Sequence, residues 1–124
     1  MYFENQVFTT IDAPPNNGGG NVYRDCTFES IYDTPLSHAH SIFESCDFAG
    51  MEQECNCFEG AILIDCSFTN CHFKGISFFV NRFVECSFEN CTFTEDHFGT
   101  KCSFADNKWY GCTQANCEGF DADW

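Results

Sequence analysis

Positive charge is scarce in this sequence of 124 residues. Lys and Arg together number 5 against 19 Asp and Glu, so the formal net charge is −14. A surface of this sign repels nucleic acid and anionic membranes, and we expect direct binding to neither. It favours a basic partner, such as a protein that ordinarily binds DNA.

Long apolar runs are also missing. No stretch approaches the roughly 20 apolar residues that a membrane-spanning helix needs. The first residues, Met1-Tyr2-Phe3-Glu4, lack the basic region and apolar run of a secretory signal peptide. We therefore expect a cytoplasmic protein with one domain, because a chain of this length can bury a single core.

Phenylalanine and cysteine are abundant, with 16 Phe and 11 Cys. Thirteen of the 16 Phe fall on one five-residue register, at positions 3, 8, 28, 43, 48, 58, 68, 73, 78, 83, 88, 93 and 98. Small or thiol side chains stand two residues earlier, at Cys26, Ser41, Cys46, Ala61, Cys66, Cys71, Cys86, Cys91 and Cys102. The repeating unit is therefore Cys/Ala/Ser-x-Phe-x-x.

A period of five matches neither an α-helix nor an ordinary β-strand. It fits a chain that turns a corner every five residues, with two side chains of each unit pointing inward. In a four-sided coil, positions 20 residues apart should stack. The sequence predicts columns of Cys26, Cys46, Cys66 and Cys86; of Phe28, Phe48, Phe68 and Phe88; and of Tyr23, Phe43, Leu63 and Phe83. After a one-residue slip near residues 99–101, it predicts that these columns continue to Asn107, Trp109 and Phe104 respectively.

The pattern resembles the pentapeptide-repeat family over residues 21–119, and more weakly over residues 2–10. The resemblance implies an all-β fold, a right-handed four-sided parallel β-helix of about five to six coils. The single domain, 1–124, would comprise an N-terminal cap and Pro/Gly loop (1–20), coils (21–119) and a C-terminal cap (120–124). Because Asp33 and Gln53 take inward positions, we expect distorted corners or loops at 31–41 and 50–57.

Catalytic and metal-binding patterns are weak. Cys55 and Cys57, with His38 and His40 upstream, form the one cluster that could hold a metal, and it lacks the paired spacing of zinc knuckles. We expect free thiols that act as small inward side chains. A core packed with Phe leaves no cavity, and no nucleophile–base arrangement is visible. The sequence thus predicts neither an enzyme nor a bound cofactor or metal.

The outward positions suggest two binding surfaces. An acidic column of Asp25, Asp65, Glu85 and Asp106, interrupted by Ser45, would stack like charges at a cost of about 1 kcal/mol for each close pair. An apolar patch of Ile42, Ile62, Ile64, Phe79, Val80 and Val84 would serve partner binding or self-association. The alternatives are a merely solvated acidic edge and a chain segment folded over the patch. Phe120 and Trp124 are expected to cover the last coil or to contact a partner.

Two functions follow from these surfaces. Some pentapeptide-repeat proteins are acidic dimeric rods that mimic DNA and bind type II topoisomerases. The resemblance implies a non-enzymatic protein-binding module, an inhibitor or decoy of a DNA-binding protein such as a topoisomerase, a nuclease or a host-defence factor met by a phage. The alternative is a scaffold, monomer or homodimer, that binds protein through its apolar patch. A mimic should lose affinity steeply with salt, whereas the scaffold should not.

Overall fold

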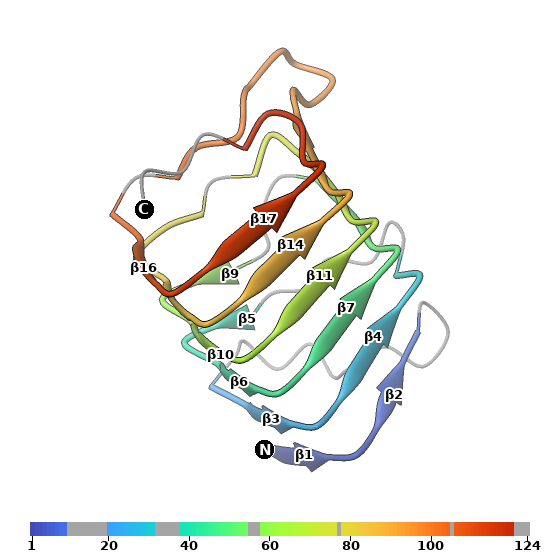
Figure 1. The fold of residues 1–124 in the computed structure, drawn as a ribbon, viewed down its shortest axis with the longest axis vertical. Coiled ribbons are helices and arrows are strands. Elements are labelled where there is room, and N and C mark those ends of the chain that lie inside the picture. The colour runs from blue at the N-terminus through green and yellow to red at the C-terminus, as the bar shows by residue number, and fades with distance from the viewer. Residues whose placement is uncertain (10–19, 32–37, 55–57, 77, 105, 121–124) are drawn as a thin grey trace.

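In a computed structural model, the chain winds into a four-sided parallel β-solenoid (Figure 1). The structure describes residues 1–9, 20–31, 38–54, 58–76, 78–104 and 106–120. All named strands pair in parallel, and the described residues include no helix. The expected all-β fold class is therefore confirmed.

The four sides are called the A, B, C and D faces. The A face contains β1 (Tyr2–Glu4), β3 (Val22–Arg24), β6 (Ile42–Glu44), β10 (Ile62–Ile64), β13 (Arg82–Val84) and β16 (Lys108–Tyr110). The B face contains β2 (Val7–Phe8), β4 (Thr27–Glu29), β7 (Asp47–Ala49), β11 (Ser67–Thr69), β14 (Ser87–Glu89) and β17 (Thr113–Ala115). The C face contains β8 (Glu52–Glu54), β12 (His72–Lys74) and β15 (Thr92–Thr94), and the D face β5 (His38–Ala39) and β9 (Phe58–Glu59).

The 20-residue register is confirmed through the middle of the chain. Leu63 pairs with Phe43 and Phe83, and Phe68 pairs with Phe48 and Phe88. In each three-residue strand of these coils the central side chain is buried and its neighbours point outward. Twelve of the thirteen in-register Phe residues are buried in the core.

Aromatic rings stack along the axis of the solenoid. The rings of Phe48, Phe68 and Phe88 lie 4.6 Å apart from centroid to centroid and within 5° of parallel. On the A face, the Tyr23 and Phe43 rings are 4.9 Å apart. This spacing matches the roughly 4.8 Å between paired strands, so a column of identical rings fits the backbone pairing without strain.

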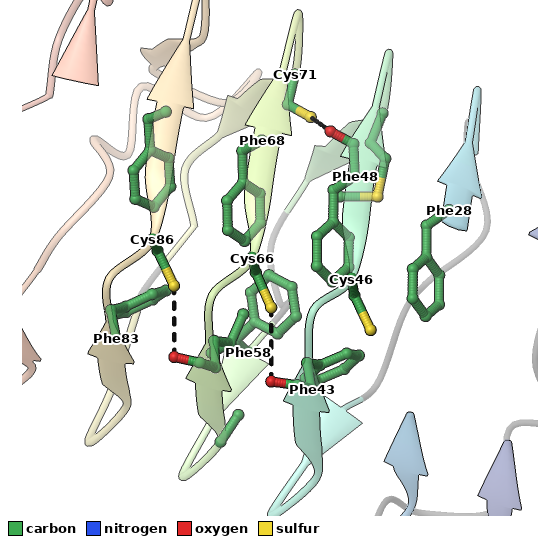
Figure 2. Close-up of a cluster of buried hydrophobic side chains, with 14 of the residues drawn as sticks. Phe28, Phe43, Cys46, Phe48, Phe58, Cys66, Phe68, Cys71, Phe83 and Cys86 are labelled. Carbon is green, nitrogen blue, oxygen red and sulfur yellow. Dashed lines mark hydrogen bonds between the residues drawn. The ribbon is translucent and has the colours of Figure 1, made fainter. Parts of the chain in front are cut away.

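The inward cysteines connect successive coils. The Sγ atoms of Cys66 and Cys86 donate to the carbonyl oxygens of Phe43 and Leu63 at 3.5 and 3.4 Å (Figure 2). The Cys46 Sγ donates in the same way to the Tyr23 carbonyl at 3.4 Å. Each bond joins a thiol to the central residue 23 positions earlier in the chain. All nine described cysteines are free thiols, whereas Cys55 and Cys57 lie outside the described residues. Cysteine therefore fills the small position as Ala would and adds a weak donor.

A buried asparagine, Asn81, connects successive coils in the same way on another inward column. Asn81 donates from Nδ2 to the Phe58 carbonyl at 3.1 Å, and its Oδ1 accepts from the Ala61 amide at 2.9 Å. Asn107 repeats this arrangement, since its Oδ1 accepts from the Asn81 amide and its Nδ2 donates to Phe78. Paired in this way, the buried amides carry little desolvation penalty.

The predicted one-residue slip is wrong. Arg82 pairs with Lys108, and Ser87 pairs with Thr113, so the offset rises from 20 to 26 residues. The columns accordingly exchange members: Trp109 stacks on Phe83 at 4.3 Å, Phe104 stacks on Phe78 at 5.2 Å, and Asn107 follows Asn81.

The six extra residues form a loop between β15 and Cys102. The Asp96 carboxylate holds this loop together, because its Oδ1 accepts from the amides of Phe98 and Thr100 at 2.9 Å. His97 contacts Glu54, two coils away, with 2.9 Å between Nδ1 and Oε1. Phe98 keeps the five-residue phase by coincidence and is 79% exposed.

The expected distortions at 31–41 and 50–57 are wrong wherever these segments are described. Gln53 is the buried centre of regular strand β8, paired with Phe73. Ile31 and Ser41 are buried in register, and His38 pairs with Phe58. Asp33 lies outside the described residues.

The described residues near both ends of the chain pack onto the solenoid. Strands β1 and β2 of the N-terminal segment continue the A and B faces. At the other end the ring of Phe120 packs against those of Phe88, Phe93, Phe104 and Trp109 and covers the last coil. Trp124 and most of the Pro/Gly loop lie outside the described residues.

Replacing one ring of the B-face column should be costly. We predict that Phe68→Ala destabilises the protein by about 3–5 kcal/mol, because it opens a cavity between two stacked rings. Phe98→Ala is the matched control and should leave stability within about 0.5 kcal/mol, since that side chain is exposed. Chemical denaturation measures both. Equal losses in the two variants would contradict the register.

Thiol burial predicts a pH dependence of stability. Burial raises the pKa of Cys112 and of Cys117 above the ordinary thiol value. Above pH ~8.5 these thiols ionise in the unfolded chain before they do so in the folded one, so stability should fall between about pH 8 and 10. Denaturant titrations across this range should show a smaller fall in the Cys112→Ala/Cys117→Ala variant. An identical slope in both proteins would refute the assignment.

Candidate protein-binding surface

The structure places three of the four acids of the predicted acidic column together. Asp25, Ser45, Asp65 and Glu85 follow the A-face strands at one corner, each with φ between 51° and 53°. Their amides donate across the coils, as from Asp65 to the Val84 carbonyl at 2.8 Å. We call this column the AB corner. Side chains that leave such a corner point into solvent, so Asp25, Asp65 and Glu85 form an exposed acidic edge.

Asp106 does not belong to the AB corner, which corrects the prediction. The Glu85 amide donates to the Tyr110 carbonyl, so the next residue of the column is Gly111, with φ 65°. Lys108 pairs with Arg82. Asp106 precedes Lys108 by two residues and Val80 precedes Arg82 by two residues, so Asp106 is equivalent to Val80. The six-residue insertion therefore moves Asp106 to the corner between the D and A faces.

Further acids extend the edge onto the B face. Asp47, Glu29 and Glu89 occupy outward positions of β7, β4 and β14, and no Lys or Arg stands in any B-face strand. The acidic region is therefore broader than the predicted column.

The structure places the A-face residues of the predicted apolar patch next to one another. Ile42 pairs with Ile62, and Glu44 pairs with Ile64, which in turn pairs with Val84. Ile42 and Ile64 are each 37% exposed, and Ile62 and Val84 are half-buried. The patch then turns the corner, because Phe79 pairs with Glu59 on the D face and Val80 occupies the corner itself.

The A face differs from the rest of the molecule in charge. Seven of the twelve positions that flank its strand centres are apolar or aromatic: Tyr2, Val22, Ile42, Ile62, Ile64, Val84 and Tyr110. Three are basic (Arg24, Arg82 and Lys108) and two are acidic (Glu4 and Glu44). Three of the five cations of the chain thus lie on one face, and that face carries a net charge of +1 in a protein of −14.

Sequence reasoning missed Lys108 and Tyr110 because it misplaced the insertion. A signal was present, however. Asn81 and Asn107, Cys86 and Cys112, and Cys91 and Cys117 are each separated by 26 residues. Three matched pairs with one shared offset indicate an insertion of six residues.

Some solved structures match this chain. The matching solved structures include a pentapeptide repeat protein (Rfr23) from the cyanobacterium Cyanothece 51142, at 9% identity and a TM-score of 0.40, covering 94% of this chain and 83% of that one. They also include QnrB1 (R167E, trypsin-treated), a plasmid-mediated fluoroquinolone resistance protein, at 14% identity and a TM-score of 0.24, covering 94% and 66%. No protein-family model and no curated protein matches the chain.

Both TM-scores are below 0.5, and the architecture is established instead by the chain's own register. Five-residue units place the same inward positions in register every 20 residues on successive coils. The chain is a four-sided parallel β-solenoid built from five-residue units.

The described residues border a hollow that the sequence did not predict. A cavity of about 310 Å³ lies beside the inserted loop and is lined by Phe93, Thr94, Glu95, Lys101, Cys102 and Gly119. Burial raises the pKa of the Cys102 thiol, which keeps it protonated and weakly nucleophilic. The cavity therefore lacks an activated nucleophile.

In the described part of the chain, no three His, Cys, Asp or Glu side chains gather into a metal site. His38 belongs to β5 on the D face and His40 occupies the corner that follows, whereas Cys55 and Cys57 lie outside the described residues. Within the described ranges, no helix is long and apolar enough to cross a membrane.

Val80 is unusual among the corner residues. Its φ is 51°, a left-handed conformation that is unfavourable for a β-branched side chain. The other non-Gly residues with positive φ are Asn, Asp, Ser, His or Glu. Val80 is 48% exposed and its neighbour Phe79 is 44% exposed, so packing does not repay the backbone cost. Such strain is typical of positions kept for contact with a ligand.

We predict that Val80→Asn stabilises the solenoid by about 1 kcal/mol, because Asn tolerates the left-handed conformation. Val84→Asn is the control: it makes the same change in a β-strand and should not stabilise. Thermal unfolding measures both variants. A lower melting temperature for Val80→Asn would show that Val80 packs favourably.

Proposed function

We propose that this protein is a non-enzymatic binding module for another protein and that the A face is its contact surface. The observation that carries the proposal is the composition of that face. Apolar and aromatic side chains gather there, together with three of the five cations, while acids predominate elsewhere.

Physical chemistry supports this use of the A face. Ile42 and Ile64 expose apolar area at the centre of a flat sheet, and soluble monomers rarely keep such area without a use. Tyr and Arg, which are enriched at energetically important contacts, flank it at Tyr2, Tyr110, Arg24 and Arg82. Of the five charged residues on this face, Arg24 and Glu44 already form an ion pair with each other.

A second candidate function is DNA mimicry. The acidic AB corner continues onto a B face whose strands contain Asp47, Glu29 and Glu89 but no cation. Carboxylates in rows along a rod can occupy the phosphate-binding groups of a DNA-binding protein, such as a topoisomerase, a nuclease or a host-defence factor. The partner would then be basic, and duplex DNA would compete for it.

Capture of partners on immobilised protein distinguishes the two candidates. Ile64→Asp should abolish capture through the A face, whereas Thr69→Asp, an outward change on the B face of the same coil, should not. This capture should survive 0.5 M salt and excess duplex DNA, because apolar contacts are weakly screened.

The mimic predicts the opposite pattern. Asp65→Lys/Glu85→Lys should abolish capture, Glu59→Lys/Glu118→Lys should retain it as the charge-matched control, and both salt and DNA should displace the partner. If Ile64→Asp and Thr69→Asp behave alike, the A face is not the contact surface.

A further inference from the structure

The A face is self-complementary about its fourth strand. We propose that its partner is a second copy of this chain, packed face to face with the two stacks of coils running in opposite directions and the two-fold axis along β10. This inference rests on the proposed protein-binding function and names the occupant of the A face.

Strand β10 supplies the centre of the interface. It is the only strand of the A face whose two outward residues are both isoleucine, Ile62 and Ile64. A residue on a two-fold axis meets its own copy, and apolar side chains can do so without penalty. The two-fold axis is therefore more favourable along β10 than along a neighbouring strand with charged outward residues.

The strands on either side carry complementary charges at equal distances. One coil before β10, strand β6 presents Ile42 and Glu44, and one coil after it, strand β13 presents Arg82 and Val84. Rotation about β10 places β6 opposite β13 of the second copy. Glu44 then lies level with Arg82 of the second copy, with about 12 Å between Cα atoms for sheets ~10 Å apart, which these long side chains can span. Symmetry forms this ion pair twice.

The next strands out match as well. Arg24 on β3 comes to face Tyr110 on β16 of the second copy. A guanidinium over a tyrosine ring is a favourable cation–π pair. Arg24 also retains its own ion pair with Glu44, 3.4 Å from Nη2 to Oε1.

The alternative face-to-face orientation is unfavourable. With the axis along the stack, Ile42 would face Glu44 of the second copy, and both copies would place Arg82 on the same level. No acid of the A face would then lie level with Arg82. The opposed orientation of the stacks follows from this difference.

The charge of the whole molecule selects the same face. Two copies of net charge −14 repel each other, and the AB corner and the B face would bring carboxylates together. The A face, at +1, is where approach costs least. Its extent, roughly 24 by 10 Å for six strands of three residues, is below that of a standard interface, so the dimer should be weak and strongly dependent on concentration.

Analytical ultracentrifugation of the purified full-length chain tests the proposal at 0.15 M salt, from 5 to 500 µM. The wild-type protein should shift from monomer to dimer within this range. Glu44→Arg and Arg82→Glu should each raise the dissociation constant at least tenfold. Glu89→Arg and Lys101→Glu, which make the same charge changes outside the A face, should not. Circular dichroism checks that all variants fold.

Mixing the two interface variants is the most discriminating part of the experiment. An equimolar mixture of Glu44→Arg and Arg82→Glu proteins should form a heterodimer, because one ion pair is restored with reversed polarity and the other is formed by the original Glu44 and Arg82. A monomeric wild-type chain at 500 µM, equal effects of the control variants, or a mixture that stays monomeric would overturn the proposal. A monomer that still captures a different protein, with capture lost in Ile64→Asp, would refute this inference and leave the proposed function intact.

Discussion

Stacking of identical side chains at the strand spacing is the interaction on which the whole structure depends. The Phe48, Phe68 and Phe88 rings sit 4.6 Å apart because their strands pair in parallel register. A shift of one residue would turn every ring outward. Thiols reinforce the register, since Cys66 and Cys86 each donate to the coil before them. The core thus fixes the height and direction of every outward side chain.

Because the register is fixed, outward side chains lie in columns along the solenoid. Acidic and basic side chains occupy different columns. Acids occupy the AB corner and the B face, whereas Arg82 and Lys108 stand one above the other on the A face. The same frame explains the strain at Val80, because each coil must turn through a left-handed residue whatever its side chain. A sequence that keeps valine there gives up stability, which fits a surface used for contact.

The function of this molecule depends on which face binds which partner. The exposed isoleucines of the A face and its small net charge of +1 suit a protein contact. The arrangement of its side chains about β10 suits a second copy of the chain. The acidic edge suits a basic partner and remains free in that dimer. The two proposed surfaces are therefore compatible within one molecule.

The amino-acid pattern alone was enough to predict the core and most of the fold. Phe recurs every five residues with Cys two residues before it, and the same residue types recur 20 residues apart, so the four-sided solenoid and the columns through Phe88 could be predicted. The A-face part of the apolar patch followed from the same 20-residue spacing.

The position of the insertion became clear only in the tertiary structure. Phe98 keeps the local phase while lying in an inserted loop, and only pairing between distant strands, Arg82 with Lys108, shows that it has left the core. That pairing moved Asp106 away from the acidic corner and brought Lys108 and Tyr110 to the A face, because stacking depends on contacts between coils and not on local spacing.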